Sequence, residues 1–256
     1  MKLKVIYILK FIFLYILPIF VGFYCLHLYF LCGSNKIYSY KGVSIYTSSN
    51  QYSDTIAWKE VIDECDYLLS NQGIKMCNIK IRIFSSWDEL EEKKSNSASA
   101  GYLPLSHIIL LGPVNLNDKK NITRELSGYK SRSIASVLAH EMTHVYQHRK
   151  MPLRAFKNDW KLEGQAEFVS NESSFDVDEG LRIFLVDGEE VENIMHGNKY
   201  NAVGFSYFRC RLRTDYLIRY KGISYEDFFD TEYDLPTLDH EIRTSLIKGE
   251  YIFNSK

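Results

Sequence analysis

The longest hydrophobic run of the chain lies near its N-terminus. Residues 11–31 contain no charged side chain, and at about 1.5 Å per helical residue they cover about 30 Å, the thickness of a bilayer core. This run exceeds the apolar region of a secretory signal peptide, which is about 7 to 15 residues long. Lys2, Lys4 and Lys10 precede it, and the positive-inside tendency then places the N-terminus in the cytoplasm. We expect a cytoplasmic tip and transmembrane anchor at 1–34, and an extracytoplasmic domain at 35–256.

Beyond this run, the spacing of apolar residues predicts strands early and helices late. Isoleucines alternate with polar residues over 78–84, which is typical of a half-buried strand. The apolar run at 107–112 ends at a Gly-Pro pair and predicts a second strand. Helical spacing and capping residues predict helices at 54–71, 87–94, 134–149, 159–170, 203–220 and 237–247. This order of elements indicates an α+β fold: a short sheet followed by helices.

The net charge and the cysteine content of the chain argue against some classes of function. The formal net charge is -1, which does not favour binding to nucleic acid. Cys65, Cys77 and Cys210 lie outside the N-terminal run and form no CxxC pair, so we do not expect cysteine to ligate zinc. A disulfide among them stays open, because it needs an oxidising compartment and suitable geometry. The oligomeric state is not indicated by the sequence.

Residues 140–144, His-Glu-Met-Thr-His, carry the clearest chemistry, and they lie within a predicted helix. His140 and His144 are four residues apart, so both rings project from one helix face and can bind the same Zn²⁺. Glu141 is rotated by about 100° from His140, so it reaches a water beside the metal more readily than the metal itself. The pattern alone arises by chance in about one chain in 150 of this length. A third ligand is therefore required.

Glu163 is the candidate for that third ligand. It follows His144 after 18 residues and lies in the predicted helix 159–170. A glutamate at one set spacing lowers the chance rate by a further factor of about 16. Glu167 is one turn beyond Glu163 and could accept the free ring N–H of a ligand histidine. Taken alone, such a glutamate pair is more often a solvated acidic face, but the upstream histidines favour a metal site.

The motif, its spacing and the following Trp-Lys-Leu-Glu-Gly-Gln-Ala-Glu-Phe segment resemble the gluzincin metallopeptidases, most closely the small bacterial peptidase-MA-like domains. The similarity covers about residues 54–220, and only residues 137–167 are specific. It implies a zinc-dependent peptidase that hydrolyses peptide or protein substrates. We expect an endopeptidase, and the sequence leaves the choice between endo- and exopeptidase open. A gluzincin-like domain of this kind has a short sheet followed by zinc-binding helices.

This resemblance also implies individual roles. Glu163 becomes the third zinc ligand and Glu167 the acid that orients a ligand histidine. The strand at 107–112 becomes the edge strand along which an extended substrate lies. No G-x-M-E-N motif is present, so aminopeptidase activity is not supported. Gln147 and Lys150 stand where the metzincin pattern has Gly and His.

In the gluzincin family, a Tyr or His on a later helix donates the hydrogen bond that stabilises the oxyanion formed during hydrolysis. His196, Tyr200 and Tyr207 are the candidates. We expect Tyr200, because it precedes Gly204 and an aromatic run as in the family, although any of the 19 tyrosines could serve in packing. His148 is expected to be structural or exposed, because a fourth protein ligand would close the catalytic position.

Two other functions compete with a membrane-anchored metallopeptidase. One is a zinc-stabilised binding or scaffold domain of the bacterial envelope that has lost hydrolysis. The presence of Glu141 weighs against it, because zinc retention alone does not need this residue. The other is a membrane protein whose HExxH pattern is accidental, which predicts no stoichiometric zinc.

Overall fold

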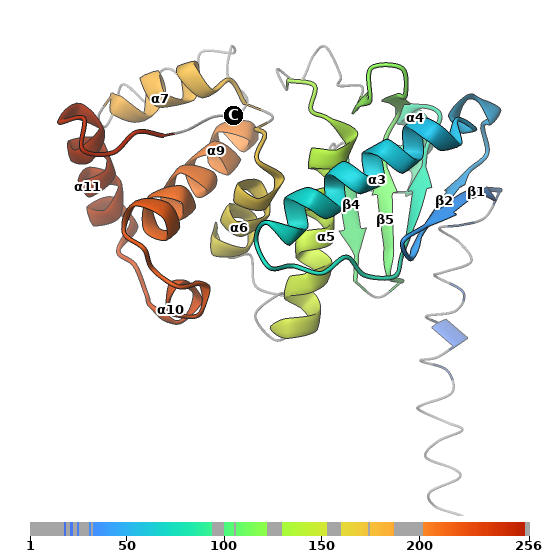
Figure 1. The fold of residues 1–256 in the computed structure, drawn as a ribbon, viewed down its shortest axis with the longest axis horizontal. Coiled ribbons are helices and arrows are strands. Elements are labelled where there is room, and N and C mark those ends of the chain that lie inside the picture. The colour runs from blue at the N-terminus through green and yellow to red at the C-terminus, as the bar shows by residue number, and fades with distance from the viewer. Residues whose placement is uncertain are drawn as a thin grey trace, which may run out of the picture. The chain divides into compact units, whose positions relative to one another are not determined.

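A computed structural model of the chain divides into two compact units, Met1–Asp54 with Asn78–Pro113, and Thr55–Cys77 with Val114–Lys256 (Figure 1). The residues that the structure describes are 18, 21, 22, 25, 31, 33–93, 100–104, 106–121, 130–152, 160–173, 175–186 and 202–253. The predicted α+β class agrees with the elements of these two units, since the sheet lies in the first and most helices in the second.

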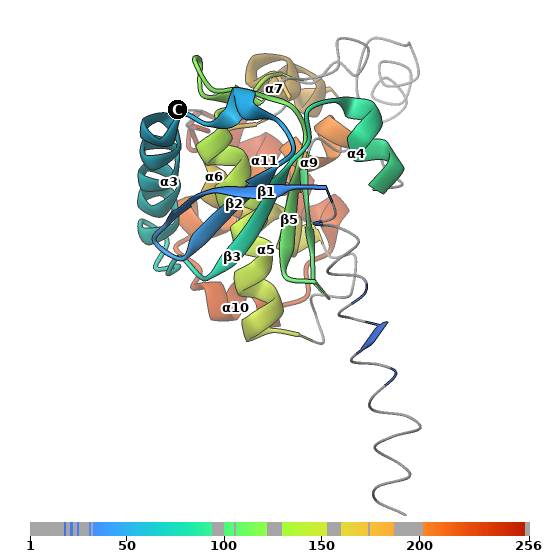
Figure 2. The same cartoon turned by 90° about the vertical axis from the view of Figure 1, so that its right-hand side faces the viewer.

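The first unit is built on a five-stranded mixed sheet with the strand order β1-β2-β3-β5-β4 (Figure 2). The central strands β2, β3 and β5 are parallel, and the outer strands β1 and β4 are antiparallel to their neighbours. A short helix, α4, begins after Ser86, whose hydroxyl accepts the N–H of Glu89 at 3.2 Å. The bounds are Asn35–Tyr40 for β1, Val43–Thr47 for β2, Ile79–Ile83 for β3, Ala100–Leu103 for β4, Ile108–Leu111 for β5 and Trp87–Lys93 for α4.

The strand expected to form the sheet edge is not an edge. β5 pairs with β3 on one side and with β4 on the other, and all four of its residues are buried. Its backbone N–H and C=O groups are therefore engaged on both sides and cannot pair with a substrate. The edge strand at this end of the sheet is β4, which the sequence pattern did not predict.

The second unit is mainly helical, and α6 packs against both α5 and α9 (Figure 1). A cluster of buried aromatic and aliphatic side chains from α6 to the C-terminus forms its core. Its strands are β6 (Val114–Asn115) and β7 (Lys120–Asn121). Its helices are α3 (Thr55–Ser70), α5 (Ile134–Lys150), α6 (Trp160–Ser170), α7 (Val177–Leu185), α9 (Ala202–Asp215), the π-helical η4 (Tyr216–Tyr220), α10 (Tyr225–Asp230) and α11 (Leu235–Ile247).

The close approach of α6 to α9 depends on Gly164. A Cβ atom at this position would lie 2.7 Å from the carbonyl oxygen of Cys210 and would also collide with Oγ1 of Thr214. Only glycine lets the two helix backbones come so close. The candidate ligand Glu163 is therefore followed directly by the glycine on which the packing of α6 against α9 depends.

The prediction of a transmembrane anchor at 1–34 is wrong. Within the part of the chain that the structure describes, no helix is long and apolar enough to cross a membrane. A span needs about 20 consecutive apolar residues in one helix, and most of the run at 11–31 lies outside the described residues. The described residues support the α+β class but not the anchor, and the single-pass, extracytoplasmic localisation inferred from the anchor is not supported.

The question of a disulfide is settled for the described cysteines. Cys65, Cys77 and Cys210 are all free thiols. Cys65 is fully buried between α3 and α5, where its Sγ lies 3.8 Å from Sδ of Met142. Burial raises the pKa of the Cys65 thiol far above its ordinary value. This thiol serves in the packing of the helix that carries the histidines.

Candidate metal centre

The helix α5 presents both candidate histidines from a largely buried position. It begins after Ser133, whose hydroxyl accepts the backbone N–H of Ser136 at 3.0 Å. Its last turn carries three basic residues, which suits the negative end of the helix dipole. His140 is 9% exposed and His144 is half-buried. The helix thus holds two imidazoles, one turn apart, at a partly enclosed face.

The three predicted ligands converge in the structure. Nε2 of His140 lies 3.2 Å from Nε2 of His144, and each of these nitrogens lies 3.5 Å from Oε2 of Glu163. In a tetrahedral zinc site with bonds of 2.0–2.1 Å, neighbouring ligand atoms are about 3.3 Å apart. The three measured separations are close to this value. The two histidines and the glutamate therefore have the spacing of one triangular face of a tetrahedral zinc site.

The chemistry of the three candidate ligand atoms also fits zinc. Oε2 of Glu163 is buried and has no hydrogen-bond partner among the described residues. A buried carboxylate oxygen without a partner is costly, and a divalent cation shared with the two imidazole nitrogens would compensate it. Nitrogen and carboxylate ligands of this kind suit Zn²⁺. We conclude that the residues present fit a zinc ion.

The electrostatics of the cluster are strongly coupled. Burial lowers the pKa of His140, but contacts with the carboxylates of Glu163 and Glu167 outweigh burial and raise it to about 10. The pKa of His144 is raised in the same way, mainly by Glu163. Burial raises the pKa of Glu163, but the two histidines outweigh it and hold the pKa far below its usual range. A metal bound here would compete with protons for these groups, so its binding would release protons.

Glu167 lies behind His140, as the sequence had suggested. Its Oε1 is 3.0 Å from Nδ1 of His140, and the glutamate is 1% exposed. The same oxygen accepts a hydrogen bond from Nη1 of Arg132 at 2.9 Å. Burial raises the pKa of Glu167, but Arg132 and His140 outweigh it and lower the pKa to about 2. Glu167 is therefore an anion that contacts the ring nitrogen facing away from the triangle.

Arg132 is a functional neighbour that sequence reasoning missed. Its guanidinium is buried and also donates to Ser136 at 3.0 Å and to Ser170 at 2.6 Å. It joins the start of α5 to the end of α6. No local pattern marks this arginine, because its role exists only once the two helices lie side by side.

The start of α6 is fixed by the residues just before Glu163. The Trp160 ring packs edge-on against the ring of Phe228, with centroids 5.6 Å apart. The buried Nζ of Lys161 donates to the carbonyl oxygens of Phe229 at 3.2 Å and Thr231 at 2.5 Å, at the end of α10. These contacts hold the first turn of α6 in place and so position the Glu163 carboxylate.

Glu141 lies beside the triangle without belonging to it. It is 7% exposed, and its charge contributes to raising the pKa of both histidines. Among the described residues, the group able to hold a metal is His140, His144 and Glu163 alone. This arrangement suits a base that acts next to the metal. His148 is half-buried in the last turn of α5.

One of the three candidate oxyanion donors lies close to the site. Tyr207, on α9, is half-buried, and its ring centroid is 6.3 Å from that of His140 in an edge-on arrangement. Tyr200, which the sequence favoured, and His196 lie outside the described residues. The position of Tyr207 therefore favours it as the oxyanion donor, while the role of Tyr200 stays a prediction.

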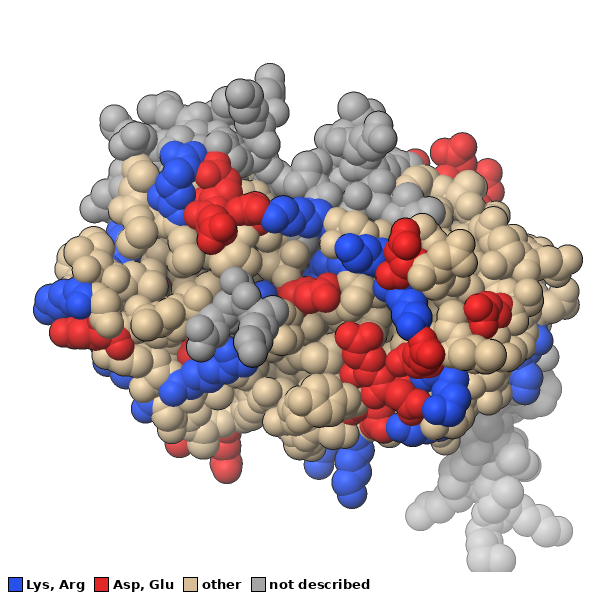
Figure 3. Space-filling model, turned by 45° about the horizontal axis from the view of Figure 1, so that its top comes forward, with Lys and Arg blue, Asp and Glu red and all other residues tan. Residues whose placement is uncertain are grey.

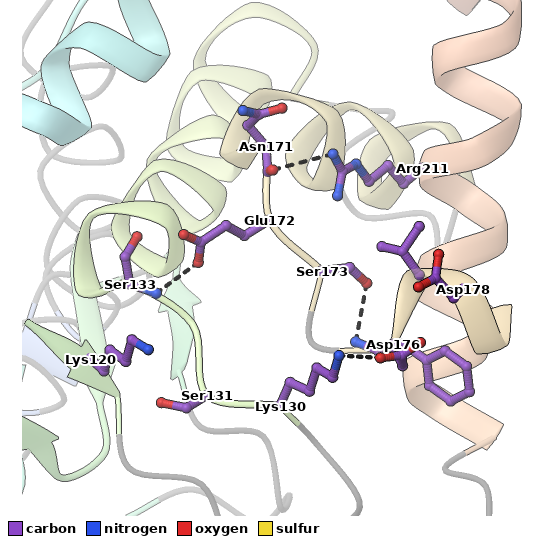
Figure 4. A pocket seen from close by; sticks show the side chains of 12 residues that line it. Lys120, Lys130, Ser131, Ser133, Asn171, Glu172, Ser173, Asp176, Asp178 and Arg211 are labelled. Atoms are coloured by element: carbon purple, nitrogen blue, oxygen red, sulfur yellow. Dashed lines mark hydrogen bonds and ion pairs between the residues drawn. The ribbon is translucent and has the colours of Figure 1, made fainter. Parts of the chain in front are cut away.

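A separate cavity of about 370 Å³ lies at the N-terminal ends of α5 and α7 (Figure 4). Several of its polar groups have partners: Lys130 pairs with Asp176, Glu172 accepts the backbone N–H of Ser133 at 2.7 Å, and Arg211 donates to the carbonyl oxygen of Asn171 at 3.2 Å. Asp176 also caps α7 through the N–H of Glu179 at 2.9 Å. None of the three candidate ligands lines the cavity.

Basic and acidic side chains are interspersed on the face drawn in Figure 3, and among the described residues no broad basic surface covers it. The expectation that the chain does not bind nucleic acid stays a prediction. Comparisons of the chain with models of known protein families, with curated proteins and with solved structures found no match. The gluzincin resemblance therefore rests on the motif, its spacing and the triangle of ligand atoms.

Proposed function

We propose that this chain is a zinc-dependent metallopeptidase that hydrolyses peptide bonds. The observation that carries the proposal is the convergence of His140, His144 and Glu163, with separations of 3.2 to 3.5 Å, beside the buried Glu141. Structural zinc sites have four protein ligands, whereas catalytic sites have three and keep one position for water or substrate. Within the described residues the group has three members, which supports catalysis over a purely structural role.

The chain's own residues supply the proton transfers. Zinc, when bound, acts as a Lewis acid that acidifies water and polarises the scissile carbonyl. Glu141 accepts a proton from the attacking water as the new C–O bond forms. It then donates this proton to the leaving amine nitrogen as the C–N bond breaks, so the base returns to its starting state. Glu167, held by Arg132, keeps the ring of His140 oriented throughout.

We assign the oxyanion donor to Tyr207 and expect Tyr207→Phe to lower kcat by about 10²- to 10³-fold with little change in zinc content. The hydroxyl is the only group that this substitution removes, so loss of rate reports on its hydrogen bond. Steady-state hydrolysis of a quenched fluorescent peptide measures the effect. Tyr200→Phe is the matched comparison. Loss of rate in Tyr200→Phe, with normal rate in Tyr207→Phe, would return the role to Tyr200.

Removing the metal tests the proposal as a whole. The purified full-length chain is expected to contain one zinc per molecule and to cleave fluorescein-labelled casein. A chelator such as 1,10-phenanthroline is expected to abolish cleavage, and added Zn²⁺ to restore it, because three ligands hold the ion reversibly. Absence of zinc would mean that the motif is accidental. Stoichiometric zinc without cleavage of any unfolded protein would favour the zinc-stabilised binding domain.

A further inference from the structure

The side chain that contacts Nδ1 of His144 differs chemically from the carboxylate that contacts Nδ1 of His140. Nδ1 of His144 lies 2.8 Å from Oε1 of Gln147, one turn further along α5. Gln147 is 1% exposed. Its Nε2 donates to the carbonyl oxygen of Leu162 at 2.8 Å and to Oε1 of Gln165 at 3.0 Å. A neutral amide thus takes, at His144, the place that the Glu167 carboxylate has at His140.

These hydrogen bonds leave the amide only one orientation. A backbone carbonyl can only accept a hydrogen bond, so the NH₂ group of Gln147 must face Leu162. The amide oxygen then faces His144, and since it can only accept, the proton of the neutral imidazole must reside on Nδ1. Nε2 is left with its lone pair directed toward His140 and Glu163, the direction a metal ligand requires.

The same side chain also reaches the third ligand. Leu162 immediately precedes Glu163, so the hydrogen bond from Gln147 to the Leu162 carbonyl fixes the backbone that carries the carboxylate. One amide on α5 therefore acts on two of the three ligand residues, on two different helices. A purely packing role would not require an amide, because burying one costs free energy unless every polar atom is paired.

We propose that Gln147 is a positioning residue for the metal, which sets the tautomer of His144 and the placement of Glu163. This inference rests on the proposed zinc site. It predicts an effect on metal affinity and on the ligand field, whatever substrate the protein cleaves.

The test uses Gln147→Met, which keeps the approximate size of the side chain and removes all its hydrogen bonds. Zinc affinity of the full-length chain, measured by competition with a chromogenic chelator, is expected to fall by about 10- to 100-fold. The visible absorption bands of the Co²⁺-substituted protein are expected to shift, because the ring and the carboxylate move. Wild-type affinity together with unchanged cobalt bands would overturn the inference.

Two further variants keep the test decisive. Gln147→Asn retains an amide but shortens its reach, so it is also expected to weaken zinc binding, and it replaces Gln147→Met if that variant does not fold. Ser245→Ala removes another buried hydrogen bond, to Tyr216, and is expected to leave zinc affinity unchanged within about twofold. If wild type binds no zinc, the proposed function fails. If wild type and both Gln147 variants bind zinc equally, only this inference fails.

Discussion

Replacing Glu141 by glutamine is expected to remove peptide hydrolysis while leaving zinc bound. Glutamine has nearly the same shape but cannot accept the proton of the attacking water, so kcat should fall by at least about 10²- to 10⁴-fold. Zinc content should stay at the wild-type level, because Glu141 does not belong to the group of metal ligands among the described residues. Hydrolysis of labelled casein and zinc per chain, by plasma mass spectrometry, are measured on the same sample.

The control for Glu141→Gln is Glu64→Gln, an exposed glutamate on α3. It makes the same chemical change away from the triangle and should leave both rate and zinc content unchanged. Normal hydrolysis in Glu141→Gln would exclude Glu141 as the base. Loss of zinc in that variant would instead make it a contributor to metal binding, although it does not belong to the ligand group among the described residues.

The second large effect is expected from Glu163→Ala. This substitution removes one of the three ligand atoms, so zinc affinity should fall by more than the roughly 10- to 100-fold typical of changes behind the ligands. The folded wild type should be stabilised by added zinc, by about 2.7 kcal/mol at a free concentration 100 times the dissociation constant. At the same zinc concentration the variant should show little stabilisation. Thermal unfolding with and without zinc measures the difference.

Glu232→Gln is a suitable control for Glu163→Ala, since Glu232 is exposed and lies in the turn after α10. It should keep the full zinc-dependent stabilisation. A Glu163→Ala variant that retained one tightly bound zinc would show that the carboxylate is not a ligand. The resemblance to gluzincins would then lose its most specific element.

Local pattern was enough to place the helices of the site. The expected helices 134–149 and 159–170 are observed as Ile134–Lys150 and Trp160–Ser170, because helical spacing and capping depend on residues only a few positions apart. The relation of His140 to His144 follows from the same helix geometry. The strands β1 and β2 and the helices α7 and α10 were not foreseen. β1, for example, has mostly exposed or half-exposed residues and a weak alternation.

Strand order could not be inferred in this way. The apolar run that became β5 has the same composition whether its strand is central or at an edge, and only its pairing with β3 and β4 shows that it is central. A similar limit applies to the hydrophobic run at 11–31. Its apolar character is a local property, whereas a membrane span requires one long helix, which none of the described residues provide.

For the metal centre, too, the sequence and the tertiary structure determined different features. The sequence by itself determined which side chains could ligate zinc, because ligand chemistry and helical spacing are local, and it pointed to Glu163 by spacing. Only the tertiary structure brought Oε2 of Glu163 to 3.5 Å from both imidazoles. It also revealed Arg132 and Gln147 as partners of the site. Gln147 contacts His144 within α5. The contacts of Arg132 with Glu167 and of Gln147 with Leu162 arise only where α5 and α6 pack together, and such packing joins residues too far apart in the chain for any local pattern to encode.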